Sequence, residues 1–524
     1  MRAPRKRSIR PAFQQLILAL LFLAVLPGGA LAQAGGEAGI QVTGFRVEGE
    51  NPLSGETTRA ILAPFTGEGV TLDGLQAAAA ALEARLKEEG HAFLRVVLPP
   101  QEARGEIVLR VLAFKLGAVS VSGNKRFDTA NILASLPALK AGESPNLREV
   151  ARSQALANEH PAKQVSVTME QGRAPDTVDA AVQVEESNPA QFFATLNNTG
   201  TKETGKWRLG AGAQHSNLFG RDHAITATYT TSPGHTDDVK QYGVYYRAPF
   251  YALHGSLSAY YTRSDTNSGT VAEFFQVSGR GEFAGLRWTH RLLPLGAYGQ
   301  VLELGVEDRF FENDVAFAGV PIGVNVRSRP LLAHYEGRLD GAGYGVRGSI
   351  DFARNLSGGG SNDEAAYSGN RAGATPEWEA WRFSLEGSRL LGGWVASARL
   401  RGQATRDALI PGEQFALGGA SWVRGLPERE ASGDSGYVAN LEATTPELAD
   451  GLRGAAFLDW GSVRVRDAAA GQSARQGASS VGAGLRWRAG RNASVVLDWA
   501  HVLDGAGTTS AGRSFTHCAV VVRF

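Results

Sequence analysis

The sequence has almost no cysteine: Cys518 is the only one among 524 residues, so no disulfide can form within the chain. It also lacks a charge imbalance, because 53 lysines and arginines stand against 52 aspartates and glutamates, and this excludes a general attraction to nucleic acid. The histidines are scattered without metal-site spacing, and no Cys/His cluster could hold zinc. We therefore expect no metal and no cofactor.

Long apolar helices are lacking as well, apart from a short run near the start. The chain opens with the basic MRAPRKRSIR, continues with QQLILALLFLAVL and reaches an A-x-A site that ends at Ala32. These are the parts of a secretory signal peptide. The apolar run is shorter than the about 20 residues of a spanning helix, which disfavours a membrane anchor as the alternative. We predict a signal peptide at 1–32, a short segment at 33–39 and a mature protein outside the cytoplasm that begins near Gln33.

Glycine, by contrast, is abundant, with 65 residues, and aromatic residues recur along the whole chain. An exported, glycine-rich chain without a disulfide or an apolar helix is typical of a bacterial outer-membrane β-barrel. The composition therefore predicts strands as the membrane-crossing elements.

Two copies of one small unit come first. A strand-like segment is followed by a short helix, a longer helix with leucines on one face, and two strands; Thr71 is the expected N-cap of the longer helix and Gly90 its stop. The same βααββ order recurs and ends in segments whose valines alternate with polar residues, as in half-buried strands. This organisation resembles the POTRA domain, and we predict one copy at 40–115 and another at 116–188. The alternative is a pair of α+β domains that act only as spacers.

From 189 to 524 the pattern changes to short alternating segments separated by clusters of glycine, asparagine, aspartate and proline. Trp207, Leu209 and Ala211 share one side of such a segment, and charged residues and glycines lie mostly on the other. A barrel with a lipid-facing outside and a wet lumen requires this pattern. We predict an antiparallel barrel of about 16 strands, in which short and long connections alternate. Its last residue, Phe524, resembles the insertion signal of outer-membrane proteins.

Two segments are similar to catalytic or nucleotide-binding motifs but lack their context. The GDSGY that contains Ser435 is similar to the nucleophile segment of trypsin-like proteases, yet His517 follows the serine, whereas in that family the histidine precedes it. A Gly-x-Gly-x-x-Gly pattern, similar to the dinucleotide-binding motif, begins at Gly343, but it lies inside an alternating strand with no helix after it. We therefore expect no enzyme.

Two POTRA-like modules followed by about sixteen strands resemble the transporter of bacterial two-partner secretion, the haemolysin secretion/activation family. Further matching stretches are NNTGTKETGKWRLGAG, SNLFGRD and ANEHPAKQVSVTME. The resemblance implies a protein of the bacterial outer membrane whose POTRA domains, in the periplasm, hold an unfolded secreted exoprotein by adding it to a sheet edge. It also implies the lipid bilayer and the barrel-assembly machinery as partners.

Members of this family carry a long loop between strands eleven and twelve that folds back into the pore, with a Val-Arg-Gly-aromatic motif at its tip. Here the segment 406–433 corresponds to that loop, and Val423, Arg424, Gly425 and Leu426 stand at the tip, with leucine in place of the aromatic residue. The residues between the signal peptide and the first module are too few for the N-terminal plug helix that members often carry. We therefore expect the loop alone to gate the pore.

The family's second motif has an aspartate and a glycine at alternate positions after a phenylalanine or glycine, and Phe457, Asp459 and Gly461 match it. Alternation along this segment independently places Asp459 inside the barrel. We expect a charge-assisted pair between Arg424 and Asp459 that holds the loop in the channel, with Gly425 allowing a close approach. The alternative is a solvated arginine in a mobile loop and an unrelated aspartate.

Three rival functions remain beside secretion of an exoprotein. A barrel-assembly insertase of the same superfamily usually has more POTRA domains. A passive β-barrel channel would not need POTRA modules, and an outer-membrane enzyme would need a catalytic constellation.

Overall fold

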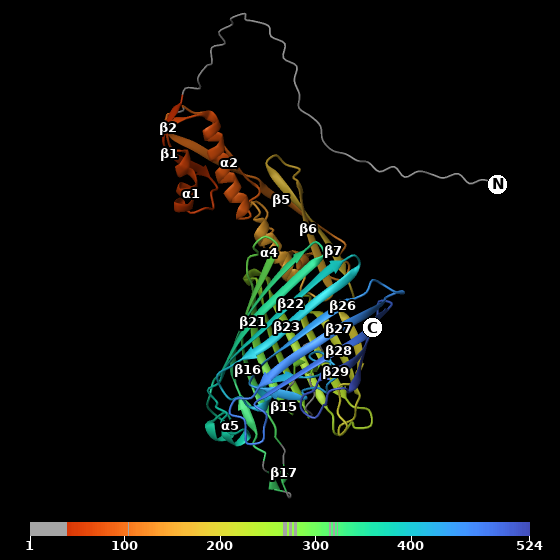
Figure 1. Ribbon diagram of the computed structural model, residues 1–524. Coiled ribbons are helices and arrows are strands. Elements are labelled where there is room, and N and C mark those ends of the chain that lie inside the picture. Colours follow the sequence, from red (N-terminus) through yellow and green to blue (C-terminus); the bar gives the residue numbers. More distant parts are fainter. Residues whose placement is uncertain are drawn as a thin grey trace, which may run out of the picture.

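The computed structural model shows two small modules in line at one end of a β-barrel (Figure 1). We call the barrel end next to the modules the module end and the opposite one the far end. The predicted signal peptide, and the residues after it up to 38, lie outside the described residues. The structure describes residues 39–102, 104–265, 270–271, 275–276, 280–313, 316–317, 320–321 and 323–524.

The first module is a four-stranded sheet, in the order β2-β1-β4-β3, covered by two helices. Thr71 caps the longer helix as expected, because its side chain accepts the backbone N–H of Gly74. The predicted βααββ order omitted β2, whose two glycines give it low strand propensity. The elements are β1 (Ile40–Gly49), α1 (Gly55–Leu62), η1 (Ala63–Phe65), β2 (Gly67–Val70), α2 (Leu72–Glu88), β3 (Leu94–Val97) and β4 (Gly105–Ala113).

The second module follows directly and is a three-stranded sheet in the order β5-β7-β6. Valines at alternate positions, among them Val165, Val182 and Val184, are buried against its helices. Its first strand begins at Lys115, one residue before the boundary drawn from the sequence. The elements are β5 (Lys115–Ser122), α3 (Thr129–Ala134), α4 (Leu147–Ala157), β6 (Lys163–Gln171) and β7 (Thr177–Glu186).

Sixteen antiparallel strands then close into a barrel, when β19 and β20 are counted as one strand interrupted at Arg329. In chain order they are β8 (Ala190–Asn197), β9 (Arg208–Leu218), β10 (His223–Thr231), β11 (Gln241–Phe250), β12 (Gly255–Ser264), β15 (Gly281–Arg291), β16 (Tyr298–Phe311), β19 (Val326–Ser328) with β20 (Pro330–Gly341), β21 (Tyr344–Asn355), β22 (Glu379–Leu391), β23 (Trp394–Ala404), β26 (Ser435–Thr444), β27 (Leu452–Arg464), β28 (Arg475–Ala489), β29 (Ala493–Asp504) and β30 (Ser514–Arg523).

The strands alternate between an apolar outer face and a polar lumen face, as the sequence predicts. On β27, for example, Leu458 is 39% exposed on the outside and the next residue, Asp459, is fully buried inside. This alternation is what a barrel in lipid requires. No helix in the described part of the chain is both long and apolar enough to cross a membrane.

The connections differ between the two ends of the barrel. At the module end they are short: two residues join β20 to β21, and two join β22 to β23. At the far end they are longer and carry small elements of their own, including the helix visible there in Figure 1. These elements are α5 (Glu364–Asn370) and the short hairpins β13 (Thr270–Val271) with β14 (Phe275–Gln276) and β17 (Ala316–Phe317) with β18 (Val320–Pro321). A one-turn helix, η2 (Tyr251–Leu253), lies at the module end.

The ring closes where β30 pairs with β8, over five residue pairs. Asn198 extends this seam, since its side chain accepts the N–H of Cys518 at 2.8 Å and donates to the carbonyl of Thr516 at 2.7 Å. Phe524 lies just past β30 and its N–H donates to the carbonyl of Phe192 at 2.8 Å. The Phe524 side chain is 70% exposed.

Candidate functional site: the inserted loop in the barrel lumen

The connection between β23 and β26, residues 405–434, is folded into the barrel; we call it the inserted loop. β23 and β26 are the eleventh and twelfth barrel strands, so the loop has the position that the resemblance implies. It contains η3 (Pro411–Glu413) and forms a hairpin of β24 (Phe415–Leu417) and β25 (Ala431–Gly433). The tip, Val423 to Leu426, lies between these two strands in sequence.

The tip sits in an apolar socket on one part of the barrel wall. Val423 and Leu426 have no exposed surface. The leucine that stands in place of the family's aromatic residue therefore keeps a buried apolar contact. The socket is built by side chains from four successive strands: Val438 of β26, Val463 of β27, Ala478 of β28 and Val502 of β29.

Within this socket Arg424 binds Asp459 of β27, and we call these two residues the tip pair. Arg424 Nε donates to Asp459 Oδ2 at 2.7 Å and Nη2 to Oδ1 at 2.8 Å, which is a bidentate contact. The backbone N–H of Arg424 adds a third bond to the same carboxylate at 3.1 Å. The guanidinium carbon also lies 3.4 Å from the ring centre of Phe457. The structure thus brings these three motif residues together as expected, while their role in gating stays a prediction.

More charged groups surround the tip pair than the motifs indicate. Glu442 of β26 accepts from Arg424 Nη1 at 2.7 Å and from Arg486 of β28 at 3.0 Å. Asp498 of β29 accepts from Arg486 at 2.6 Å and lies 3.6 Å from Arg424. Three carboxylates therefore share two arginines, one of which belongs to the loop. The sequence analysis did not single out these wall residues, although strand alternation places them on the lumen face with Asp459.

Glycines allow the close approach between loop and wall. Gly425 has a φ of 95°, which favours glycine, and a Cβ there would lie 3.2 Å from the Cβ of Ala500. Its N–H donates to Nε2 of His517 on β30 at 3.0 Å. A Cβ on Gly461 would lie 2.7 Å from a methyl carbon of β24, so this motif glycine makes room for the hairpin. His517, which the sequence pairs with Ser435 only as a catalytic look-alike, is thus a contact of the tip.

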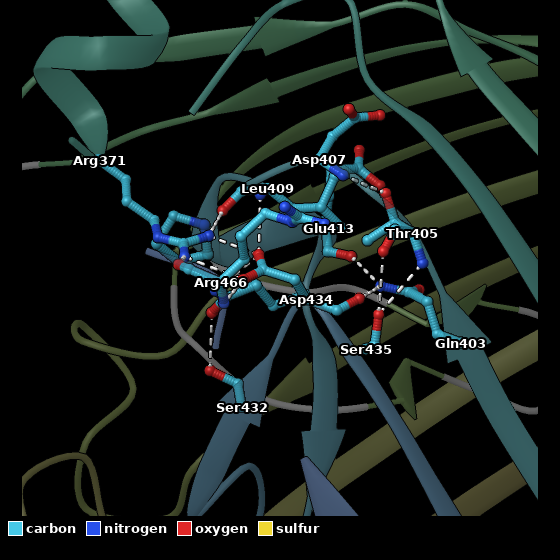
Figure 2. Close-up of polar contacts among 12 residues, drawn as sticks. Arg371, Gln403, Thr405, Asp407, Leu409, Glu413, Ser432, Asp434, Ser435 and Arg466 are labelled. Carbon is cyan, nitrogen blue, oxygen red and sulfur yellow. Dashed lines mark hydrogen bonds and ion pairs between the residues drawn. The ribbon is translucent and has the colours of Figure 1, made fainter. Parts of the chain in front are cut away.

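One end of the inserted loop is fixed at the far end of the barrel by Asp434, which is 2% exposed. Both terminal nitrogens of Arg371 donate to its carboxylate, at 2.5 and 2.9 Å, and so do the backbone N–H groups of Leu409 and Arg466 (Figure 2). Arg371 comes from the far-end segment that carries α5. Ser435, next in the chain, accepts the N–H of Thr405 at 3.1 Å.

A second attachment of the loop lies in its first half and is made by Glu413, which is also 2% exposed. Its carboxylate accepts from Arg309 of β16 at 2.6 Å, from Arg382 of β22 at 3.2 Å and from the hydroxyl of Ser328 at 3.1 Å. Asp434 and Glu413 therefore attach the inserted loop in addition to its tip. Glu430 adds a further contact, because its carboxylate accepts the N–H of Thr509 at 2.9 Å.

A second buried cluster joins the second module to the barrel. Lys163, at the start of β6, forms an ion pair with Asp222 in the turn between β9 and β10, and both side chains have no exposed surface; we call them the rim pair. Asn131 accepts from Lys163 at 2.9 Å and donates to Asp222 at 2.9 Å, and the Tyr251 hydroxyl donates to Asp222 at 2.6 Å. Burial, opposed by the charge of Asp222, lowers the pKa of Lys163.

Beside the rim pair, His160 and Glu159 contact the barrel as well. Nε2 of His160 meets the carbonyl of Ser216 at 2.5 Å. Glu159 forms ion pairs with Arg247 of β11 and Arg291 of β15. Three strands at the module end are therefore tied to one short stretch of the second module.

The described residues contain no group of three or more His, Cys, Asp or Glu side chains arranged to hold a metal ion.

Two family models match the chain. One is described as haemolysin secretion/activation protein ShlB/FhaC/HecB and matches residues 177–487, which is more than half of the chain. The other is described as POTRA domain, ShlB-type, and matches residues 40–113.

Individual relatives are distant in sequence. The heme/hemopexin transporter protein HuxB of Haemophilus influenzae is 20% identical over 405 residues, which cover 73% of this chain and 68% of that protein. The outer membrane transporter CdiB of Dickeya dadantii is 23% identical over 376 residues, covering 67% of this chain and 62% of that protein. Among solved structures, CdiB from Escherichia coli superposes with a TM-score of 0.76 at 18% identity, over 95% of this chain and 93% of that one, and supports the fold.

Proposed function

This chain belongs to the haemolysin secretion/activation family of outer-membrane transporters, and from that premise we propose that it secretes one large exoprotein, or a few, through its barrel. The barrel lies in the outer membrane and the two modules, which are POTRA domains, lie in the periplasm. The module end therefore faces the periplasm and the far end the outside. The family is one of transporters rather than enzymes.

In this proposal the POTRA domains hold the unfolded exoprotein by strand addition. The sheet order supports this, because β2 and β3 are edges of the first domain and β5 and β6 are edges of the second. An added strand bonds through its main chain, so such an edge accepts varied sequences. On β6 the N–H groups of Val165 and Val167 already donate to side chains of Asn158 and Gln154. We therefore expect addition on β6 to use the residues after Val167.

The single observation that carries the proposal is the tip pair. An arginine on a loop that enters from outside is bonded twice, in the lumen, to a carboxylate of the barrel wall. This attachment holds the loop inside the channel, and we propose that Val423, Arg424, Gly425 and Leu426 form the fixed part of the gate, with Phe457, Asp459 and Gly461 as its wall. Because no nucleotide is available in the periplasm, folding of the exoprotein outside supplies the direction of transport in this proposal.

Insertion of the barrel requires a second set of partners. We propose that the barrel-assembly machinery recognises β30 and places the barrel in the lipid bilayer. The exposed aromatic side chain of Phe524, directly after β30, supports recognition at this strand.

The experiment that tests the function compares culture-supernatant proteins of cells with and without the gene. We expect one large protein, or a few, to disappear in its absence and to return on complementation. The abundance of other outer-membrane barrels is measured in the same cells as the control.

The same comparison separates the rivals. An unchanged supernatant together with a loss of other barrels would identify an insertase. An unchanged supernatant with normal barrels and altered uptake of small solutes would identify a passive channel. Either result contradicts secretion as the function.

A further inference from the structure

The inserted loop does not fill the lumen evenly but packs on one part of the wall. Its tip contacts side chains of β26, β27, β28 and β29, and Gly425 donates to His517 of β30. The strands from β20 to β23 lie on another part of the barrel. We call the lumen face of β20, β21, β22 and β23 the passage wall.

Two cavities lie beside the inserted loop. The smaller is lined by the passage wall and β26, and the larger by the passage wall together with β11, β12, β15 and β16. The larger, of about 800 Å³, reaches Phe311 and Gln403 near the far end, and the smaller, of about 360 Å³, reaches Asp340 and Gly345 beside a module-end turn. Among the described residues, neither lining includes one from β27 to β30. The two linings share Arg347 and Glu386, so the cavities adjoin in series along the same wall.

The surface of this space is charged but balanced. The larger cavity is lined by six arginines and six carboxylates. Many of these groups are bonded to one another: Glu386 accepts from Arg401 at 3.0 Å and lies 3.2 Å from Arg399. Paired charges of this kind keep water at the wall and offer no large apolar area on which a chain would stick. Transport also requires binding that is weak enough for release.

From this geometry we propose that the exoprotein crosses the barrel as an extended chain along the passage wall, while the tip stays in its socket on the next strands of the ring, β26 to β29. The proposal rests on the proposed function and adds the route. The loop then forms one side of the passage, through Phe415, Trp422 and Arg429, which line the larger cavity. Because positive and negative side chains are nearly balanced along the lining, the route accepts segments of either sign.

At the far end the passage is covered. Phe311, at the end of the larger cavity, belongs to an apolar cluster with Tyr367, Trp378 and Ile410. Tyr367 lies in α5 and Trp378 follows it in the same segment. Displacement of this segment, rather than of the tip, therefore opens the route to the outside.

Single cysteines test the route. In a Cys518→Ser background, Ser384→Cys places a thiol in the larger cavity and Ser397→Cys places one in the smaller. Thr195→Cys on β8 is the control, because it lies on the lumen face, by alternation with the exposed Phe192, and lines neither cavity. Each variant is treated with a small thiol reagent, which forms a methyl disulfide, or with a maleimide that carries a bulky polymer. Ion conductance in planar bilayers and exoprotein in the supernatant are then measured.

We expect the bulky adduct at either passage position to lower conductance and secretion by at least about two-fold, and the small adduct to have little effect, because only the former fills the route. The bulky adduct at the β8 position should change neither. If only the β8 adduct blocks, or no adduct does, the route along the passage wall is wrong. If passage adducts lower conductance but no supernatant protein depends on the gene, the passage stands as the open route and the proposed function fails.

A charge variant gives an independent readout. Glu386→Gln leaves Arg399 and Arg401 without their shared carboxylate, so we expect the reversal potential in a salt gradient to shift toward anion selectivity. Glu379→Gln removes the same charge from the same strand, but Glu379 pairs with Arg354 and lines neither cavity. A shift no larger for Glu386→Gln than for this control would contradict the assignment of Glu386 to the route.

Discussion

The tip pair and the rim pair each bury an aspartate completely, but the cations that face these aspartates differ. At the rim one lysine meets one aspartate, and Asn131 and Tyr251 complete their hydrogen bonds. At the tip one arginine meets Asp459 and is also within reach of Glu442 and Asp498. Arg424 additionally lines a cavity, whereas Lys163 is sealed on all sides.

The difference indicates how each contact is used. A sealed pair has no replacement partner, so separating it would leave a charge in an apolar place, which costs several kcal/mol. The rim pair therefore acts as a permanent joint between the second POTRA domain and the barrel. The tip has a surplus of carboxylates beside a polar cavity, so its arginine can exchange partners at a smaller cost. The arginine of the tip can thus shift among these carboxylates while the tip stays in its socket.

Breaking the joint should have the largest effect. Asp222→Ala leaves Lys163 buried without its carboxylate, and we expect it to cost about 3–5 kcal/mol of docking free energy. The measurement is limited proteolysis between the second POTRA domain and the barrel, together with the melting temperature of the purified protein.

The control for this prediction removes both charges. Lys163→Met with Asp222→Leu replaces the pair by apolar groups, and such exchanges are often neutral. The double variant should recover most of the protease resistance lost in Asp222→Ala. Equal sensitivity of the single and double variants would show that loss of packing, and not an unpaired charge, causes the effect.

Breaking the tip pair should have a smaller effect on stability and a clear effect on function. Arg424→Ala removes two charge-assisted bonds to Asp459, at a cost of about 2–3 kcal/mol, while the barrel stays folded. We expect impaired secretion and a higher, noisier conductance. Arg424→Lys keeps the charge but not the bidentate geometry. Its secretion and conductance should lie between those of the wild type and those of Arg424→Ala. Normal secretion by Arg424→Ala would contradict the gating role.

Breaking the contact between Arg371 and Asp434 at the far end should have a smaller effect on stability than breaking the tip pair. Arg371→Gln removes the guanidinium that donates twice to Asp434, but the backbone N–H groups of Leu409 and Arg466 still satisfy that carboxylate. We expect a loss of about 1–2 kcal/mol and more frequent opening events in bilayer recordings, because the α5 segment loses one of its contacts with the inserted loop. Opening events at the wild-type frequency would show that the segment is held by its apolar cluster alone.

The smallest effect concerns pH at the joint. Burial lowers the pKa of His160 below its usual 6.5, and this outweighs the opposite pull of Asp222 at 3.8 Å; Lys163 and Arg247 lower it further. Nδ1 accepts the N–H of Ala162, so the docked histidine is neutral. Above pH 6.5 the docked and undocked states both hold it neutral, and docking is pH-independent. As the pH falls below 6.5, only the undocked state gains a proton, so docking weakens.

The measurement is protease sensitivity at the joint from pH 7.5 to 5.5 in the wild type and in His160→Gln. The glutamine keeps a donor for the carbonyl of Ser216 but does not titrate in this range. We expect the variant to lose much of the pH dependence. An equal pH dependence in both proteins would assign it to other groups.

Strand periodicity and the motif resemblance allow much of this structure to be predicted. Alternation places Asp459 in the lumen because side chains in a strand point to opposite faces in turn. The resemblance brings Arg424 to the same place. Neither predicts that Glu442 and Asp498 join them, because that depends on the register in which β26, β27, β28 and β29 pair. The helix α5 was also missed, since it lies inside a long connection without strand periodicity.

The joint was the least predictable part. The sequence predicts that Lys163 begins a strand and that Asp222 lies in a short turn. Nothing in the local sequence predicts a contact between them. Their contact arises only from docking one domain on another, 59 residues apart along the chain. Burial of a lysine is rare without a partner, but burial itself is not visible in the sequence.

The order of the tip's contacts along the chain has a consequence for assembly. Asp459, Asp498 and His517 all follow the inserted loop, and the last of them is 92 residues after Gly425. The socket therefore does not exist until β27, β29 and β30 have joined the sheet. Contacts between residues so distant in sequence form late in folding. Seating of the loop and closure of the cylinder are thus coupled steps, and a nascent barrel stays unobstructed until its final strand is in place.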